Sequence, residues 1–268
     1  MKKLIAMLLA LSMVLAFAGC AKTEEAPATT AAATEAAVEV APEDTAPAAA
    51  EEGVLDGGAD IAVEAAPAVM THEEYMAAEL DTAVCVETYV QATQSWWDNK
   101  ITVYCQSPDG AYFLYELACS EEDAAKLVPG TKILVNGYKG EWAGEVEVMD
   151  GTFAFVEGGD TFIAEAADVT ELLGTDELIA HQNELVAFNG LTIEAIEYKN
   201  GEPGDDIYVT VGYNGASYSF CVERYLTGPE TEVYTTVGTL KAGDVVNVEG
   251  FLYWYEGVNT HITAISLA

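Results

Sequence analysis

A gapless internal repeat constrains the fold of this chain more than any other feature of its sequence. Residues 127–138 (LVPGTKILVNGY) align with residues 240–251 (LKAGDVVNVEGF), and each copy places one glycine before an alternating strand and a second glycine inside it. A glycine inside a strand is typical of a bulge or a sharp bend. The repeat therefore predicts two structural units built from the same succession of elements.

The first half predicts a β-hairpin upstream of the repeat. A type I turn at residues 108–110, with its glycine in a bulge, places Cys105 opposite Phe113 and gives the hairpin one wholly apolar face. In the same register, Tyr104 and Tyr112 belong to the opposite, outward face.

The second half predicts a hairpin and a helix at equivalent places. Asn214-Gly215 suits a two-residue type I′ turn that sets Val209 against Phe220, again with the apolar residues on one face. A capping motif at residues 120–123 begins a helix in the first half, and Pro229 begins one in the second. Each half is thus predicted to contain a helix, a strand, a hairpin, a helix and two final strands.

Five strands with a helix between the third and the fourth is the order of the oligonucleotide/oligosaccharide-binding fold, or OB-fold. The chain resembles two tandem OB-folds, which implies a mainly β protein with two five-stranded Greek-key barrels. We expect one unit at residues 70–158, a helical connector at 159–182 and the other unit at 183–268. The alternative is one larger β-sandwich, but helices at equivalent places favour the barrels.

The N-terminal segment has the layout of an export signal. Lys2-Lys3 precedes an apolar run at residues 4–17 and then Ala18-Gly19-Cys20. Small residues directly before a cysteine resemble the bacterial lipobox, which implies cleavage after residue 19 and acylation of Cys20. Phe17 stands where leucine is usual. An ordinary signal peptide with a chance cysteine is the alternative, and the run is shorter than the ~20 residues of a spanning helix.

This layout is similar to that of surface lipoproteins of Gram-positive bacteria. It implies that the lipid bilayer is a partner through acylated Cys20 and that the protein lies on the extracytoplasmic face of the membrane. Residues 20–69 are rich in alanine, glutamate, threonine and proline, which predicts a disordered tether after the signal peptide at 1–19.

The chain is strongly acidic, with 10 Lys and Arg against 45 Asp and Glu. Residues 21–79 carry a net charge of −13, and residues 80–268 carry 7 bases and 31 acids, a net charge of −24. Neutralising many phosphates with so few bases is difficult, so we rank nucleic acid low among the ligands despite the name of the fold.

Aromatic residues are expected around one groove of the first unit. OB-folds usually bind ligands across the outer face of strands two and three and the loops beside it. The predicted ligand-binding residues are Trp96, Trp97, Tyr104, Tyr112, Trp142 and Trp254. Such rings suit stacking on sugars, peptide side chains or bases. The alternative is that they close the barrel ends or pack against the other unit.

The primary hypothesis is a non-enzymatic binding module for an uncharged or cationic ligand, a glycan or a peptide. A second hypothesis is an envelope scaffold that acts through a partner protein. A third is a metal-dependent hydrolase with Glu177, His181 and Glu184 on one helix face, although a solvated face is the preferred interpretation.

No motif for catalysis or for a cofactor is present in the sequence, which lacks a Walker loop, a Gly-x-Ser-x-Gly elbow and a zinc motif. We therefore expect neither an enzyme nor a resident cofactor or metal. The loop at 200–206 lacks the ligand pattern of a dedicated calcium loop. Four cysteines permit two bridges in three pairings, and we favour unpaired, buried thiols at Cys85, Cys105, Cys119 and Cys221.

Overall fold

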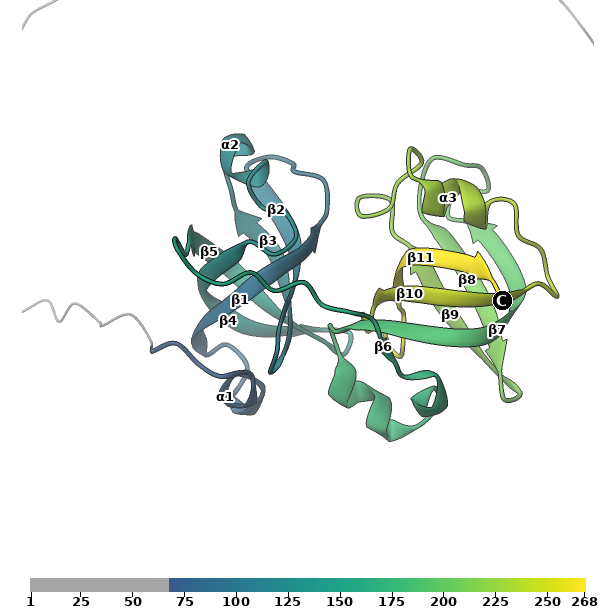
Figure 1. Ribbon diagram of the computed structural model, residues 1–268, viewed down its shortest axis with the longest axis horizontal. Helices are drawn as coiled ribbons and strands as arrows, with labels where there is room; N and C mark the ends of the chain where they lie inside the picture. The colour runs from purple at the N-terminus through teal and green to yellow at the C-terminus, as the bar shows by residue number, and fades with distance from the viewer. Residues whose placement is uncertain (1–67) are drawn as a thin grey trace, which may run out of the picture. The chain divides into compact units, whose positions relative to one another are not determined.

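The computed structural model describes residues 68–268 (Figure 1). The predicted signal peptide, the predicted lipidation site Cys20 and nearly all of the predicted tether lie outside the described residues. Within the described range, no helix is both long and apolar enough to cross a membrane.

Five strands close the first barrel. They are β1 (Ala83–Thr93), β2 (Lys100–Ser107), β3 (Gly110–Ala118), β4 (Lys132–Trp142) and β5 (Glu145–Phe155). Their order is β1-β2-β3-β5-β4, with β4 pairing back to β1. Helix α1 (His72–Ala77) precedes the barrel, and α2 (Glu121–Ala124) lies between the third and fourth strands.

The second barrel repeats this order. Its strands are β7 (Leu185–Tyr198), β8 (Ile207–Tyr213), β9 (Ala216–Val222), β10 (Val245–Phe251) and β11 (His261–Leu267), with α3 (Glu232–Val237) between the third and fourth. They are ordered β7-β8-β9-β11-β10, and β10 pairs with β7. The short β6 (Ala167–Asp168) adds to β7, and the 3-10 helices η1 (Thr170–Leu172) and η2 (Asp176–His181) lie between the barrels in sequence. The OB-fold prediction is confirmed, and the single sandwich is wrong.

The register of the second hairpin agrees with the prediction, whereas the first is shifted by one residue between its turn and a bulge at Ile101–Val103; beyond that bulge Ile101 pairs with Leu117, as expected. Val209 pairs with Phe220, as expected. In the first hairpin, Cys105 pairs with Tyr112 and Tyr104 pairs with Phe113. A shift of one residue moves every side chain of a strand to the other face. Tyr112 therefore points into the core of the first barrel, and Phe113 joins Tyr104 outside it.

Two helix predictions also need correction. The helix in the second half begins at Glu232, not at Pro229, because the Thr231 side chain accepts a hydrogen bond from the backbone N–H of Tyr234 and so caps it. The segment around His181 is the 3-10 helix η2.

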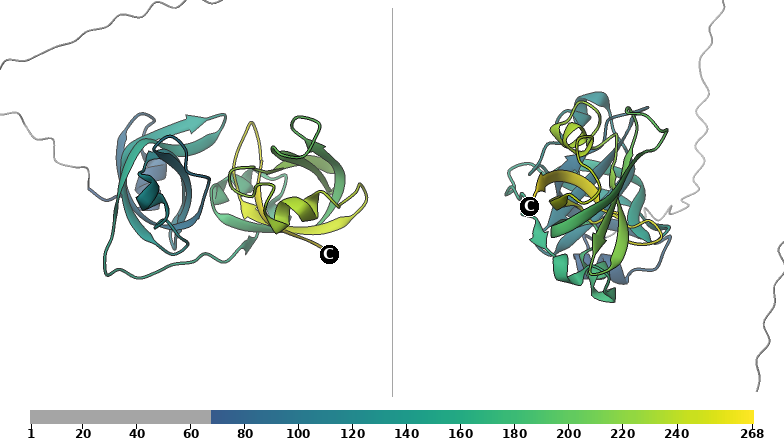
Figure 2. Two further views of the ribbon diagram at one scale, coloured as in Figure 1. Left: turned by 90° about the horizontal axis from the view of Figure 1, so that it is seen from above. Right: turned by 90° about the vertical axis from the view of Figure 1, so that its right-hand side faces the viewer.

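The two barrels belong to one compact unit and pack against each other through aromatic side chains. Tyr104 and Phe113 of the first barrel are buried against Phe251 of the second. Backbone and side-chain hydrogen bonds surround this cluster, including Leu185 N–H to Gln106 Oε1 at 2.8 Å. The outer face of β2 and β3 is therefore covered around Tyr104 and Phe113, whereas Tyr115 on the same face is exposed. Figure 2 shows each barrel as a ring of strands.

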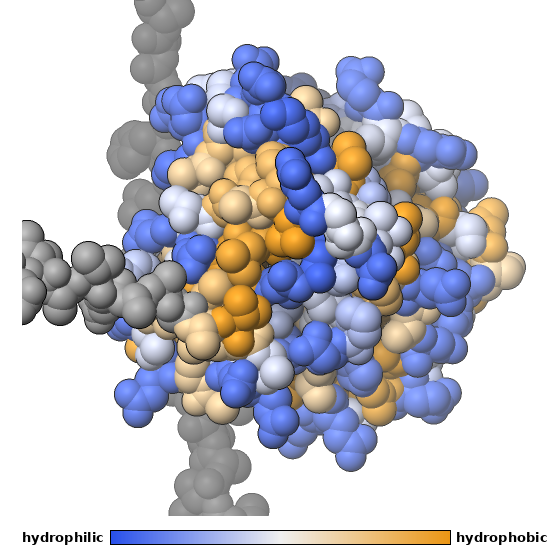
Figure 3. All heavy atoms as spheres, turned by 60° about the vertical axis from the view of Figure 1, so that its left-hand side comes forward, coloured by the Kyte–Doolittle hydropathy of each residue, from blue (hydrophilic) through white to orange (hydrophobic). Residues whose placement is uncertain are grey.

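Most of the surface in Figure 3 is hydrophilic, and apolar side chains gather near the point where the described chain begins. Three exposed apolar side chains, Val69, Met76 and Leu80, belong to α1 and its flanks. The acidic composition of the chain is thus compatible with a local apolar surface.

Candidate ligand-binding pocket

The predicted groove on the first barrel does not exist as an open surface. Tyr104 and Tyr112 are each 1% exposed. Tyr104 lies beneath the second barrel, and Tyr112 packs inside the first barrel against Tyr75, with ring centroids 5.1 Å apart. Neither side chain can stack on a ligand, because the shifted register and the packing of the barrels bury both.

The four predicted tryptophans are also dispersed. Trp142 is exposed at the end of β4, and Trp254 is half-buried against the core of the second barrel. Trp96 is half-buried against the first core, where its indole N–H donates to the carbonyl of Cys119 at 2.9 Å. Only Trp96 and Trp97 line a common pocket.

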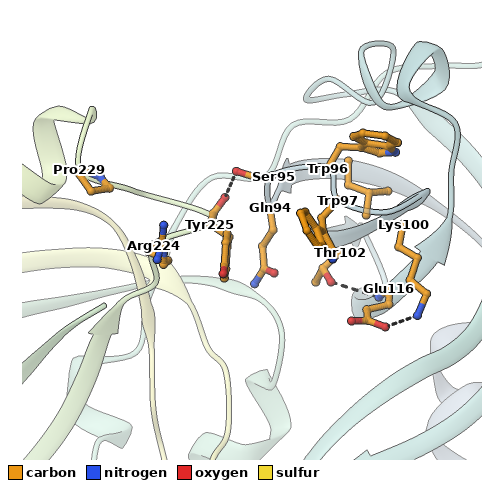
Figure 4. A pocket seen from close by; sticks show the side chains of 11 residues that line it. Gln94, Ser95, Trp96, Trp97, Lys100, Thr102, Glu116, Arg224, Tyr225 and Pro229 are labelled. Atoms are coloured by element: carbon orange, nitrogen blue, oxygen red, sulfur yellow. Dashed lines mark hydrogen bonds and ion pairs between the residues drawn. The ribbon is translucent and has the colours of Figure 1, made fainter. Parts of the chain in front are cut away.

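That pocket has a volume of roughly 620 Å³ and joins the β1–β2 turn to the segment that follows β9 (Figure 4). The residues that line it are Gln94, Ser95, Trp96, Trp97, Lys100, Ile101, Thr102, Glu116, Arg224, Tyr225 and Pro229. Trp97, 77% exposed, and Tyr225, 52% exposed, are its accessible rings.

A tight turn presents one wall of the pocket. Asp98 and Asn99 both have positive φ, and Trp97 and Lys100 exchange backbone hydrogen bonds across them at 2.9 and 3.0 Å. This is the geometry of a type I′ turn, which holds the Trp97 and Lys100 positions side by side. The ammonium of Lys100 donates to the Glu116 carboxylate at 2.6 Å.

The opposite wall comes from the second barrel. Its exposed Arg224 guanidinium lies 5.0 Å from the centroid of the Tyr225 ring. The carbonyl of Tyr225 accepts hydrogen bonds from the backbone N–H and hydroxyl of Ser95, at 2.8 and 3.3 Å. These bonds tie the two walls together.

Three residues of this pocket, Lys100, Arg224 and Tyr225, were not among the predicted site residues. Arg224 directly precedes Tyr225, but Lys139 and Lys199 also stand directly beside a tyrosine, and Lys100 follows Trp97 by three residues, so the sequence signal was weak. That signal does not reveal that segments so distant in sequence share a pocket.

A second pocket, of roughly 830 Å³, lies on the outer face of β8 and β9. Its charged lining residues are acids: Glu197, Asp206, Glu223 and Glu256. Burial raises the pKa of Glu223 to about 7. With no lysine or arginine in its lining, this pocket does not suit an anionic ligand.

The described residues contain no group of three His, Cys, Asp or Glu placed to hold a metal ion. His181 instead pairs with Glu184, at 2.7 Å between Nδ1 and Oε2. In the loop at 200–206, Asp206 pairs with Lys199 at 2.8 Å. The four cysteines of the described chain are buried and unpaired, as predicted.

No protein-family model and no curated protein sequence matches the chain. Among solved structures, it is similar to a murine DNA-binding protein bound to double-stranded DNA, with 10% identity and a TM-score of 0.35 over 69% of this chain and 96% of that one. It is similar to the Ifi202 HINa domain in complex with double-stranded DNA, with 10% identity and a TM-score of 0.33 over 67% and 94%. It is also similar to a Replication Protein A heterotrimer bound to single-stranded DNA, with 11% identity and a TM-score of 0.29 over 70% and 51%.

The prediction of a glycan or peptide ligand, with nucleic acid ranked low, is therefore corrected. The neighbouring structures are described as bound to DNA. Independently, the groove predicted to hold the glycan or peptide is covered by the second barrel. These likenesses concern the fold and assign no ligand to this chain.

Proposed function

We propose that this protein binds a nucleotide or a short single-stranded nucleic acid in the pocket between Trp97 and Tyr225. The observation that carries the proposal is the presence of two exposed aromatic rings and two exposed cations on the walls of one pocket. Aromatic rings stack on bases of any sequence, and cations neutralise the phosphates between them.

The distribution of positive charge supports this location. Lys139 is buried, with its ammonium bonded to the carbonyls of Met76 and Ala78 at 2.7 and 2.8 Å. Lys100 and Arg224 are exposed and line the same pocket. A phosphate that binds these cations competes with the neighbouring carboxylates. Glu116 lies 2.6 Å from the Lys100 ammonium, and Asp205 lies 3.9 Å from the Arg224 guanidinium.

The overall charge restricts the length of the ligand. Residues 80–268 carry a net charge of −24, which repels a long polyanion. Two cations can serve only a few phosphates. Because stacking requires unpaired bases with free faces, single strands are expected to bind more tightly than a duplex of the same sequence.

Fluorescence anisotropy with the purified full chain and a labelled single-stranded hexanucleotide tests the proposal. Trp97→Ala and Tyr225→Ala should each weaken binding roughly tenfold, since stacking contributes ~1–3 kcal/mol per base. Trp142→Ala is the matched control, because Trp142 is 61% exposed and lies outside the pocket. Absence of binding at low salt, or equal weakening by the control, would refute the proposal.

We also propose, from the sequence alone, that the protein is anchored by acylated Cys20 on the extracytoplasmic face of a bacterial membrane. The supporting features are the basic start, the apolar run and Ala18-Gly19-Cys20. Mass spectrometry of the protein extracted from its own cells should find a diacylated or triacylated Cys20 as the first residue. An intact N-terminus, or cleavage elsewhere, would contradict this. The test is independent of the ligand.

A further inference from the structure

A chain of three hydrogen-bonded side chains crosses the contact between the barrels and ends at the pocket. Gln94 Nε2 donates to the hydroxyl of Tyr104 at 3.1 Å. The same hydroxyl lies 2.6 Å from Nδ1 of His261 in the second barrel. In Figure 4 the Gln94 side chain lies between Tyr225 and Trp97. The Gln94 amide, which borders the proposed base site, is thus held in place by buried side chains of both barrels, Tyr104 and His261.

The direction of these hydrogen bonds follows from the protonation states. Burial lowers the pKa of His261 to about 3, so its ring is neutral at neutral pH and has one accepting nitrogen. Burial also raises the pKa of Tyr104 well above its usual value, so the phenol keeps its proton. Since the phenol oxygen accepts from Gln94, its proton is donated to Nδ1 of His261.

This arrangement fixes the amide of Gln94. Its nitrogen faces Tyr104, and within the described chain no donor reaches Oε1. Oε1 is not among the fully buried atoms that lack a partner, and Gln94 lines the pocket. An oriented acceptor oxygen is therefore available to a ligand in the pocket.

We propose that Gln94 recognises the base and favours bases with an exocyclic amino group, and that Tyr104 and His261 are positioning residues. This inference rests on the proposed function. Cytosine presents a donor at N4, whereas uracil presents a carbonyl oxygen at the same place. Opposite Gln94 Oε1, the amino group forms a hydrogen bond, while the carbonyl leaves two acceptors facing each other, which is unfavourable.

The test compares two trinucleotides, one of deoxycytidine and one of deoxyuridine, whose bases differ in the group at position 4 and in the proton at N3. Titration of the full chain, followed by tryptophan fluorescence at neutral pH, should give binding of the cytidine trimer roughly tenfold tighter. Gln94→Leu should bring the ratio of the two dissociation constants close to one. Tyr104→Phe keeps the buried ring but removes the hydroxyl, and it should lower the ratio while both trimers still bind.

Tyr253→Phe is the matched control, and it should leave the ratio unchanged. Tyr253 stacks on His261, with ring centroids 4.2 Å apart, but its hydroxyl is not part of the chain to Gln94. Circular dichroism melting verifies that each variant is folded. Equal binding of the trimers by the unmodified chain, tighter binding of deoxyuridine, or an unchanged ratio in Gln94→Leu would overturn the role of Gln94. Absence of binding by both trimers would overturn the proposed function itself.

Discussion

Tyr104 of the first barrel stacks on Phe251 of the second, with ring centroids 4.5 Å apart and ring planes inclined by 22°. Tyr104 belongs to β2, on the face where an OB-fold usually receives its ligand. The second barrel thus occupies the surface of the first that the sequence suggested for a ligand. The open pocket is displaced to the edge of this contact, beside Trp97 and Tyr225.

Phe251→Ala should destabilise the folded chain by ~3–5 kcal/mol, as expected for removal of a buried phenylalanine. Phe251 is 3% exposed and contacts both barrels. Urea denaturation followed by circular dichroism measures the change. Tyr255→Ala, at a position 52% exposed, should change the free energy of unfolding by less than about 0.5 kcal/mol. If Phe251→Ala were as stable as Tyr255→Ala, the contact between Tyr104 and Phe251 would contribute little to the stability of the chain.

The affinity for a single-stranded oligonucleotide should depend only weakly on salt. Each neutralised phosphate contributes a slope of about −0.7 to the logarithm of the binding constant against the logarithm of salt concentration. Two cations, Lys100 and Arg224, predict a slope near −1.4, and Lys100→Ala should reduce it by about 0.7. Lys126→Ala, outside the pocket, should leave the slope unchanged. If the binding constant of Lys100→Ala still depended steeply on salt concentration, the oligonucleotide would bind at a different surface.

The contribution of Glu145 and Glu147 to stability should fall as the pH rises from about 5 to 8. Burial raises the pKa of Glu145 to about 8 and of Glu147 to about 7. At pH values between the pKa of these two carboxyl groups in the unfolded chain and their raised pKa in the folded chain, the folded state binds more protons than the unfolded state. The stabilisation from these protons is fully present below the unfolded pKa. It is lost as the pH rises through the folded pKa. Tyr75, Tyr115 and Tyr253 also titrate close to this pair.

The matched variant for this pH dependence is Glu145→Gln. The glutamine oxygen can still accept the hydrogen bonds that Glu145 Oε2 receives from Trp254 N and Gln182 Nε2, at 2.8 and 3.1 Å. Denaturation at pH values on both sides of neutrality should show a smaller change in stability for this variant than for the unmodified chain. Glu141→Gln, at an exposed site, should retain the full change. An unaltered pH dependence in Glu145→Gln would refute the assignment.

Gly110→Ala should destabilise the first hairpin by ~2 kcal/mol or more through overpacking. A Cβ atom at Gly110 would lie 2.2 Å from Cγ of His72, a contact that cannot persist. Gly215→Ala is the comparison in the second hairpin, because a Cβ there meets open space although φ is +82°. Thermal melts should therefore show a larger loss for Gly110→Ala. Equal losses would mean that backbone strain alone explains both.

Local signals in the amino-acid sequence were enough to predict the two barrels and one of the two hairpin registers. The alternation of Ile207, Val209 and Val211 and the turn at Asn214-Gly215 are local features, and two residues with positive φ at the turn match them. Local periodicity and turn chemistry were sufficient, because each acts between residues close in sequence.

The register beside the turn of the first hairpin and the place of the pocket became evident only from the folded chain. His72 packs on Gly110, and its backbone N–H donates to Asp109 at 3.1 Å, so α1 contacts a turn that is distant in sequence. An outward aromatic such as Tyr104 is equally suited to a ligand or to a neighbouring barrel, since both provide an apolar surface. Which of them covers it depends on contacts between residues far apart in the chain, and these leave no periodic pattern in the sequence.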